Sequence, residues 1–267
     1  MKSTLRVFDA NIHGDLNQGW SQEYFQSMAL GASEMGISAG NITFLPGKNS
    51  ISLDKLVNLA KNSGKFEVIR GVDIINEDLD MVLNESIKLG CIGFKIHPRI
   101  YKHSLDDLKI SELCVAAQEI GVPIQICSFD DGTWNRLAIT KDQFSNLADK
   151  FPKTNFIFMH AGGHRVIDFM LLARRRPNVH LDLSFSLNYF NVQAIHELYS
   201  FCIGSMNGRQ WIFGSDFPSV NFDLAIDLIK NNLYTISNSE KVKILNDIFL
   251  ENARKLFPKH VWLLEND

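Results

Sequence analysis

The sequence predicts an α/β protein with the (β/α)8 architecture of a TIM barrel, built as a single domain over residues 1–267 and ending in a C-terminal helix. Short runs of β-branched and aromatic residues alternate with longer stretches of helical periodicity along the whole chain, at a spacing of about 30 residues. No linker rich in Pro, Gly or Ser interrupts this alternation. Parallel strands joined by crossover helices are therefore expected throughout.

Eight segments are predicted to be strands, because each is short and rich in β-branched or aromatic residues. They are residues 5–9, 39–45, 66–72, 91–97, 123–127, 155–160, 179–184 and 211–216. An open, doubly wound sheet is the alternative arrangement for such a chain. The sequence contains neither the G-x-G-x-x-G fingerprint of dinucleotide-binding sheets nor a phosphate-binding loop, which favours the closed barrel.

Between the strands, apolar residues recur at positions i, i+3 and i+4, so each stretch can lay one face on the sheet. The clearest helical stretches are residues 52–62, 78–89, 105–120 and 221–231. Residues that commonly cap helices precede such stretches, and glycines follow them as stop signals. The expected N-caps are Ser52, Asn76, Thr140 and Asn221, and the expected stops are Gly64, Gly90, Gly121 and Gly204.

The chain carries 27 basic and 30 acidic residues, and its net charge of -3 provides no positive field for nucleic acid or an anionic membrane. No stretch approaches the roughly 18 consecutive apolar residues of a membrane-spanning helix, and no signal-like segment opens the chain. The four cysteines form no C-x-x-C pair, as expected of reduced thiols. These features predict a cytoplasmic protein whose partner is a small molecule.

Polar residues close nearly every predicted strand, and in a barrel these carboxyl ends form the active-site face. In the opening segment Asp9-Ala10-Asn11-Ile12-His13 the polar side chains alternate, so an extended chain would direct them to one side. The other polar residues at strand ends are Arg70 and Asp73, Lys95 and His97, Gln125 and Cys127, His160, Asp182 and Ser184, and Asp216. This concentration predicts a polar site at that face of the barrel.

Arg70 lies inside an apolar run, and a buried guanidinium needs an anion as its partner. The candidates are Asp73 and the carboxylate or phosphate of a bound substrate. With Lys95, Arg70 would form a basic cluster that holds an anionic substrate at the mouth of the barrel. For Arg99 and Arg165 two interpretations are equally consistent with the sequence: solvated charges at the rim of the barrel, or residues that bind a ligand.

Five short motifs, in this order and at this spacing, carry a resemblance to a known family. They are F-D-A-N-I-H at residues 8–13, G-F-K-I-H-P at 93–98, H-A-G-G at 160–163, G-S-D-F-P at 214–218 and N-A-R-K-L-F at 252–257. Together they resemble the amidohydrolase-related barrel family (amidohydrolase 2), which includes aminocarboxymuconate-semialdehyde decarboxylase, benzoate-type decarboxylases and lactone hydrolases acting on dicarboxylic acids. The resemblance covers nearly the whole chain and implies a member of the metal-dependent hydrolase superfamily.

The resemblance also implies a divalent metal held by two histidines of the opening motif, a strand-five histidine and the strand-eight aspartate, with a strand-six histidine assisting catalysis. The matching positions here are Asn11, His13, Cys127, Asp216 and His160, so two of the four ligand positions have changed. A neutral Asn amide is a poor zinc ligand, whereas a deprotonated Cys is a good one. The expected cofactor is therefore either none or one divalent metal, with zinc at His13, Cys127 and Asp216.

Three functions are consistent with these residues. The first is hydrolysis of a small, carboxylate-bearing lactone, ester or amide, in which Asp216 activates water and His160 or His13 assists at the carbonyl oxygen. Substrate binding would then fall to Arg70, Lys95, His97 and Asn11. The second is a metal-dependent hydrolase or decarboxylase, and the third is a barrel that binds a ligand without turning it over.

The last residues of the chain, 260–267, include Trp262, Leu263 and Leu264. This apolar segment would either cover an exposed face of the barrel or dock on a partner. The sequence is therefore also consistent with a homo-oligomer.

Overall fold

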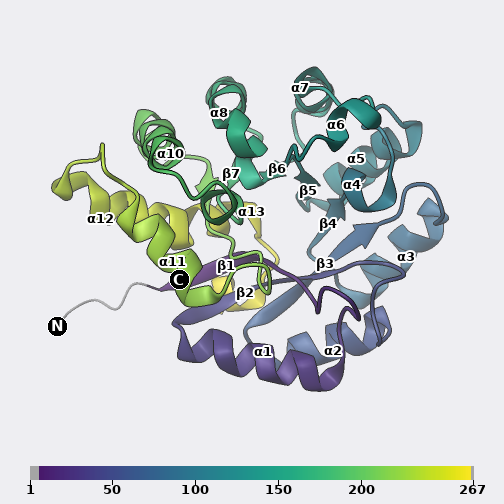
Figure 1. The fold of residues 1–267 in the computed structure, drawn as a ribbon. Helices are drawn as coiled ribbons and strands as arrows, with labels where there is room; N and C mark the ends of the chain where they lie inside the picture. Colours follow the sequence, from purple (N-terminus) through teal and green to yellow (C-terminus); the bar gives the residue numbers. More distant parts are fainter. Residues whose placement is uncertain (1–5, 266–267) are drawn as a thin grey trace.

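The protein is a nearly closed barrel of eight parallel strands, as predicted (Figure 1). The computed structural model describes residues 6–265, so Leu5, where the first strand was expected to begin, lies outside the described residues. The strands pair in sequence order and are β1 Val7–Ile12, β2 Ile37–Phe44, β3 Phe66–Val72, β4 Gly93–Ile96, β5 Ile124–Cys127, β6 Phe156–Met159, β7 Val179–Asp182 and β8 Trp211–Ile212.

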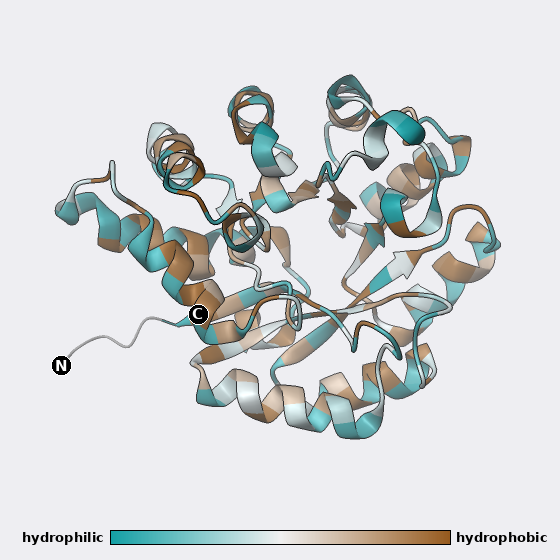
Figure 2. Ribbon diagram, in the orientation of Figure 1, coloured by the Kyte–Doolittle hydropathy of each residue, from teal (hydrophilic) through white to brown (hydrophobic). Residues whose placement is uncertain are grey.

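Helices surround the strands as an outer ring (Figure 1). They are α1 Gln22–Glu34, α2 Leu53–Ser63, α3 Leu79–Leu89, α4 Pro98–Tyr101, α5 Leu108–Ile120, α6 Thr133–Arg136, α7 Lys141–Lys150, η1 His160–Arg165, α8 Val166–Arg175, α9 Ser186–Tyr189, α10 Gln193–Ser205, α11 Phe222–Asn231, α12 Asn238–Asn246, η2 Asp247–Glu251, α13 Asn252–Leu256 and α14 Val261–Glu265. Figure 2 shows hydrophobic residues along the strands and on the helix surfaces beside them. Within residues 6–265, no helix combines the length and apolar character needed to cross a membrane.

Backbone hydrogen bonds between β1 and the segment after β8 close the barrel. The Asp216 N–H donates to the Asn11 carbonyl at 2.9 Å, and the His13 N–H donates to the Phe217 carbonyl at 2.8 Å. This pairing extends β1 beyond Asp9, where the sequence placed its end. In contrast, β8 ends at Ile212 rather than at Asp216, and the backbone of Asp216 has a left-handed conformation with φ 61°.

The C-terminal helices close the barrel at the end opposite the carboxyl ends of the strands. Phe257 and Leu263 join a buried cluster with Phe8 near the start of β1 and Ile92 just before β4. The His260 ring packs edge-on against Phe8, with ring centroids 4.9 Å apart. Residues 260–265 therefore cover a face of the barrel, which is the first of the two roles expected for this segment; residues 266 and 267 lie outside the described part of the chain.

The predicted N-caps Ser52 and Thr140 are confirmed, whereas the prediction for Asn76 is wrong. The Ser52 hydroxyl accepts a hydrogen bond within the first turn of α2, and Thr140 forms a capping box at the start of α7. The N-cap of α3 is instead Asp78. Asn76 belongs to a turn before the helix, because the Asp73 carboxylate accepts hydrogen bonds from its backbone at 3.2 Å and from its amide at 2.8 Å.

Three of the predicted glycine stops, at Gly64, Gly90 and Gly121, end their helices in the left-handed conformation that glycine adopts without strain. Gly204 is not a stop, because α10 continues to Ser205. A Cβ atom at Gly204 would lie 3.3 Å from the Ile236 side chain, so this glycine allows close packing instead. Asn221 precedes α11 as predicted, while α5 begins later than residue 105, at Leu108.

The capping box of α7 provides a test of the fold. Replacing Thr140 by Ala removes the hydroxyl that accepts from the first turn, so the free energy of unfolding should fall by about 1 kcal/mol. Urea denaturation followed by circular dichroism measures this loss. Thr140→Ser retains the hydroxyl and should stay within about 0.5 kcal/mol of the parent. Equal losses in both variants would contradict the capping role.

Candidate active site

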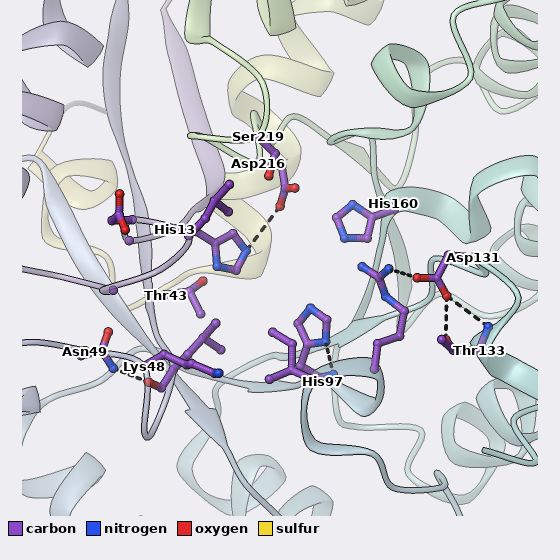
Figure 3. Close-up of a pocket in the computed structure, with 17 residues that line it drawn as sticks. His13, Thr43, Lys48, Asn49, His97, Asp131, Thr133, His160, Asp216 and Ser219 are labelled. Carbon is purple, nitrogen blue, oxygen red and sulfur yellow. Dashed lines mark hydrogen bonds and ion pairs between the residues drawn. The ribbon is translucent and has the colours of Figure 1, made fainter. Parts of the chain in front are cut away.

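A cavity of about 520 Å³ opens at the carboxyl ends of the strands, where the sequence placed the polar site. Its wall includes His13 after β1, His97 after β4, His160 after β6 and Asp216 after β8. Figure 3 shows these side chains around one space, with Lys48 reaching it from the loop after β2. The fold thus brings the predicted catalytic residues Asp216, His160 and His13 to one cavity.

A chain of hydrogen bonds beneath the cavity wall joins Asp216 to Lys95. The Asn11 amide donates from Nδ2 to Asp216 Oδ1 at 2.8 Å, and its Oδ1 accepts from Lys95 Nζ at 2.7 Å. The same Nζ lies 2.9 Å from His13 Nε2, which in turn lies 3.4 Å from Asp216 Oδ1. Asn11 and Lys95 are fully buried and do not line the cavity. The structure therefore places these two predicted substrate-binding residues behind the wall, where they hold Asp216 and His13.

Asp216 is held as a carboxylate. Burial alone would raise the pKa of Asp216, but the contact with the His13 ring and the charges of His160 and Lys95 hold that pKa well below its usual range. Burial and the Lys95 ammonium act together on His13 and lower its pKa to about 4. At neutral pH, a water molecule in the cavity would therefore meet an ionised carboxylate beside a neutral imidazole.

His160 is fixed by residues at the end of β7. Its backbone N–H donates to Asp182 Oδ1 at 3.0 Å, and its Nδ1 lies 3.2 Å from the carbonyl oxygen of Ser184. Because a carbonyl oxygen only accepts, Nδ1 carries a hydrogen. Burial lowers the pKa of His160, but the hydrogen bond with Cys127 and the charge of Asp216 outweigh burial, so the pKa is raised. The surroundings therefore favour the imidazolium form of His160.

His160 and Asp216 both adopt left-handed backbone conformations, with φ values of 67° and 61°. Such values are uncommon for residues other than glycine and persist only where the surroundings impose them. Here the Ser186 hydroxyl donates to the His160 carbonyl at 2.7 Å, while the Asp216 N–H is bound to the Asn11 carbonyl. Strained positions of this kind concentrate at functional sites, which agrees with the placement of both residues on the cavity wall.

Cys127 ends β5 and faces two histidines rather than the His13–Asp216 pair. It is buried, and its thiol forms hydrogen bonds with His97 and His160. Burial would raise the pKa of this thiol, but the charges and hydrogen bonds of the two histidines lower it well below its usual range. The expected metal site of His13, Cys127 and Asp216 is therefore not assembled, because its third member is engaged elsewhere.

The donor set at this site does not fit a divalent metal. Within residues 6–265, no three side chains of His, Cys, Asp or Glu are arranged to hold a metal ion. His13 Nε2 lies against the Lys95 ammonium, and the Asn11 amide is bonded at both its oxygen and its nitrogen. A metal ion between these groups and Asp216 would also meet the positive charge of Lys95 at short range.

Arg70 lies outside the cavity, contrary to the expectation that it joins Lys95 in holding an anion. Its guanidinium forms an ion pair with Glu77 and stacks over the Phe44 ring, 5.2 Å from the ring centroid. It borders a separate pocket beside α3. The anionic partner of Arg70 is therefore a carboxylate of the protein rather than of a substrate. That carboxylate belongs to Glu77 and not, as expected, to Asp73, whose side chain forms the turn before α3.

Two cations of the cavity wall, Lys48 and Arg99, were not assigned to the site by the sequence. The Lys48 side chain is exposed and forms no hydrogen bond or ion pair with the described part of the chain. Arg99 donates to Asp131 Oδ2 at 2.6 Å, while its buried Nε has no partner among residues 6–265. The sequence did contain one indication that they belong to the site, because Lys48 follows the carboxyl end of β2 and Arg99 follows that of β4. Arg165 instead binds Asp130 at 3.2 Å and is absent from the cavity wall.

A parallel barrel with a charged cavity at the carboxyl ends of its strands defines the class of TIM-barrel enzymes. Within that class, a family model described as Amidohydrolase matches residues 66–259. The chain belongs to this amidohydrolase family, whose members are enzymes. A comparison with curated proteins gives no match.

Solved structures share the fold over nearly the whole chain. An uncharacterised TIM-barrel protein from Bordetella bronchiseptica is 16% identical, with a TM-score of 0.73 over 96% of this chain and 99% of that one. A probable 2-pyrone-4,6-dicarboxylic acid hydrolase from Acinetobacter baumannii, with citric acid bound, is 13% identical, with a TM-score of 0.67 over 96% and 99%. An amidohydrolase from Burkholderia multivorans with bound zinc is 13% identical, with a TM-score of 0.68 over 95% and 99%. At these identities the likeness supports the fold alone.

Proposed function

We propose that the protein hydrolyses a small, carboxylate-bearing lactone, ester or amide. The observation that carries this proposal is the placement of Asp216 and His160 on the wall of one cavity with two cationic side chains, Lys48 and Arg99. An ionised carboxylate can accept a proton from water, and an imidazolium can stabilise an oxyanion. The cations supply the charge that a substrate carboxylate needs.

The reaction would begin with a water molecule held by the Asp216 carboxylate. As the water oxygen attacks the substrate carbonyl carbon, its proton passes to Asp216 and the carbonyl oxygen becomes negative. Because Nδ1 of His160 is turned to the Ser184 carbonyl, its Nε2–H would leave the hydrogen bond with Cys127 to stabilise that oxygen. When the carbonyl re-forms, the leaving oxygen or nitrogen departs and takes the proton from Asp216.

Lys48 and Arg99 would bind the substrate carboxylate, and His97 would supply a further polar contact from the same wall. The neighbour from Acinetobacter baumannii, a probable hydrolase of a dicarboxylic acid with citric acid bound, supports a carboxylate-bearing substrate for a barrel of this shape. A metal-dependent hydrolase or decarboxylase is less well supported, because the donor set does not fit a metal.

Removing the Lys48 charge is expected to raise KM about tenfold, because one charged hydrogen bond to the substrate carboxylate contributes roughly 1.5 kcal/mol. Lys48→Met keeps most of the side-chain length, and kcat should change little. Steady-state kinetics on an active substrate measure both constants. Lys55→Met, in the first turn of α2 and exposed, is the matched control. An unchanged KM in Lys48→Met would remove Lys48 from the substrate site.

A panel of lactones, esters and amides tests the proposed activity directly. Each scaffold is assayed with and without a carboxylate substituent, and hydrolysis is followed by proton release. We expect turnover to be confined to the carboxylate-bearing members. Binding of these compounds without turnover would instead identify a ligand-binding barrel, the third function considered from the sequence.

A further inference from the structure

The side chain of Lys95 is fully buried inside the barrel. Lysine is almost never buried to this extent unless its charge is paired. It projects from β4, whose neighbours in the barrel are β3 and β5. The mechanism proposed above makes no direct use of Lys95, because Lys95 does not line the cavity. Its contacts must therefore account for its presence.

Two atoms beside Asp216 lie within hydrogen-bonding distance of Lys95 Nζ. Burial lowers the pKa of Lys95, and the charge of Asp216 acts in the opposite direction. Nζ lies 2.7 Å from Asn11 Oδ1 and 2.9 Å from His13 Nε2. The Asn11 amide then donates to Asp216 Oδ1 at 2.8 Å. Its carbonyl thus faces a cation and its amino group faces an anion, an orientation that a neutral side chain with both a donor and an acceptor can satisfy.

We infer that the Lys95 ammonium is a cation supplied by the protein itself at the place where a metal-dependent barrel would hold its divalent ion. The ammonium occupies the lone pair of His13 Nε2 and offsets the carboxylate of Asp216 through Asn11. Lys95 is accordingly a positioning residue, which orients Asp216 and His13 without touching the substrate. It also explains why a donor set containing His13 and Asp216 does not fit a metal.

The inference deepens the proposed function, because it states how the base of the proposed reaction is held. It does not depend on the identity of the substrate, and the two experiments that test it use none. A negative result in these experiments is therefore distinguishable from a failure of the hydrolysis assays.

The first experiment measures binding of Zn²⁺ and Mn²⁺ by calorimetry in four proteins: the parent, Asn11→His, Lys95→Met and the double variant. If the ammonium excludes the metal, the parent and Asn11→His should bind weakly. The double variant should bind about one equivalent at least tenfold more tightly than either single variant. Adding His13→Ala to the double variant should abolish this gain.

Either of two results would overturn the inference. One is tight binding of one metal equivalent by the parent protein that His13→Ala removes. The other is a folded double variant that binds no better than Asn11→His, because the ammonium would then not be what excludes the metal. Circular dichroism establishes that each variant is folded.

The second experiment reads the His13 tautomer by nitrogen-15 NMR and begins with the parent, so it holds even if the variants do not fold. We expect the parent His13 to be neutral at pH 7, with its hydrogen on Nδ1, because Nε2 accepts from Lys95. In Lys95→Met the hydrogen should move to Nε2, which faces Asp216 at 3.4 Å. Lys55→Met, at the exposed control position on α2, should leave the signal unchanged. A hydrogen on Nε2 in the parent would contradict the inference.

Discussion

Replacing Asp216 by Asn is expected to lower kcat by roughly 10³-fold on any substrate that the protein hydrolyses, with little change in KM. Asn has nearly the same shape as Asp, and its oxygen can still accept from the Asn11 amide. The variant cannot take a proton from water, and it also lacks the negative charge that helps to raise the pKa of His160. Because the lost interaction belongs to the transition state, the effect should fall on kcat.

Steady-state kinetics with the parent and the variant measure the effect of Asp216→Asn. Asp227→Asn is the matched control, because Asp227 is exposed on α11 and is not part of the cavity wall. The control should retain the parental kcat. Full activity in Asp216→Asn would rule out Asp216 as the general base of the proposed hydrolysis.

The fold was predictable because strand and helix periodicities differ and repeat along the whole chain. Deviations occur at strand ends, where contacts made by segments far apart in the sequence decide the conformation. β1 reaches Ile12, which pairs with Ile42 of β2 and with Phe217 after β8, while β8 itself ends at Ile212. Neither effect has a local signal in the sequence.

The candidate site was predictable to the extent that strand direction determines it. Asp216, His160 and His13 follow strand ends, and the barrel brings all strand ends to one face. The direction of a side chain within that face depends on the loops. Arg70 therefore forms an ion pair with Glu77 and does not face the cavity. Lys48, from a loop to which the sequence assigned no function, lines the cavity instead.

Contacts between buried polar residues were the least predictable part of the site. Lys95 and Asn11 lie 84 positions apart, and nothing local in either segment indicates that an ammonium and an amide oxygen meet. The sequence correctly marked both residues as polar at strand ends. It could not show that their partners are protein atoms rather than a substrate.

Replacing His160 by Gln is expected to lower kcat about 10²-fold and to flatten the alkaline side of the pH profile. In the parent, the pKa of His160 is raised above its usual 6.5, and the imidazolium is the form that stabilises the oxyanion. Activity should therefore fall as the pH rises through that raised pKa. An amide can still donate a hydrogen bond, but it does not titrate.

The profile from pH 5 to pH 10 separates this role from a purely structural one. His164→Gln, at an exposed position in the same segment, should keep both the rate and the alkaline limb. Stability gives a second readout, because a raised pKa in the folded state stabilises the protein below the unfolded pKa of about 6.5. That contribution is lost as the pH rises through the folded pKa, so the Tm of the parent should decline there more than that of His160→Gln.

If His160→Gln keeps the alkaline limb of the pH–rate profile, another group titrates, and the role of His160 is then limited to shaping the cavity.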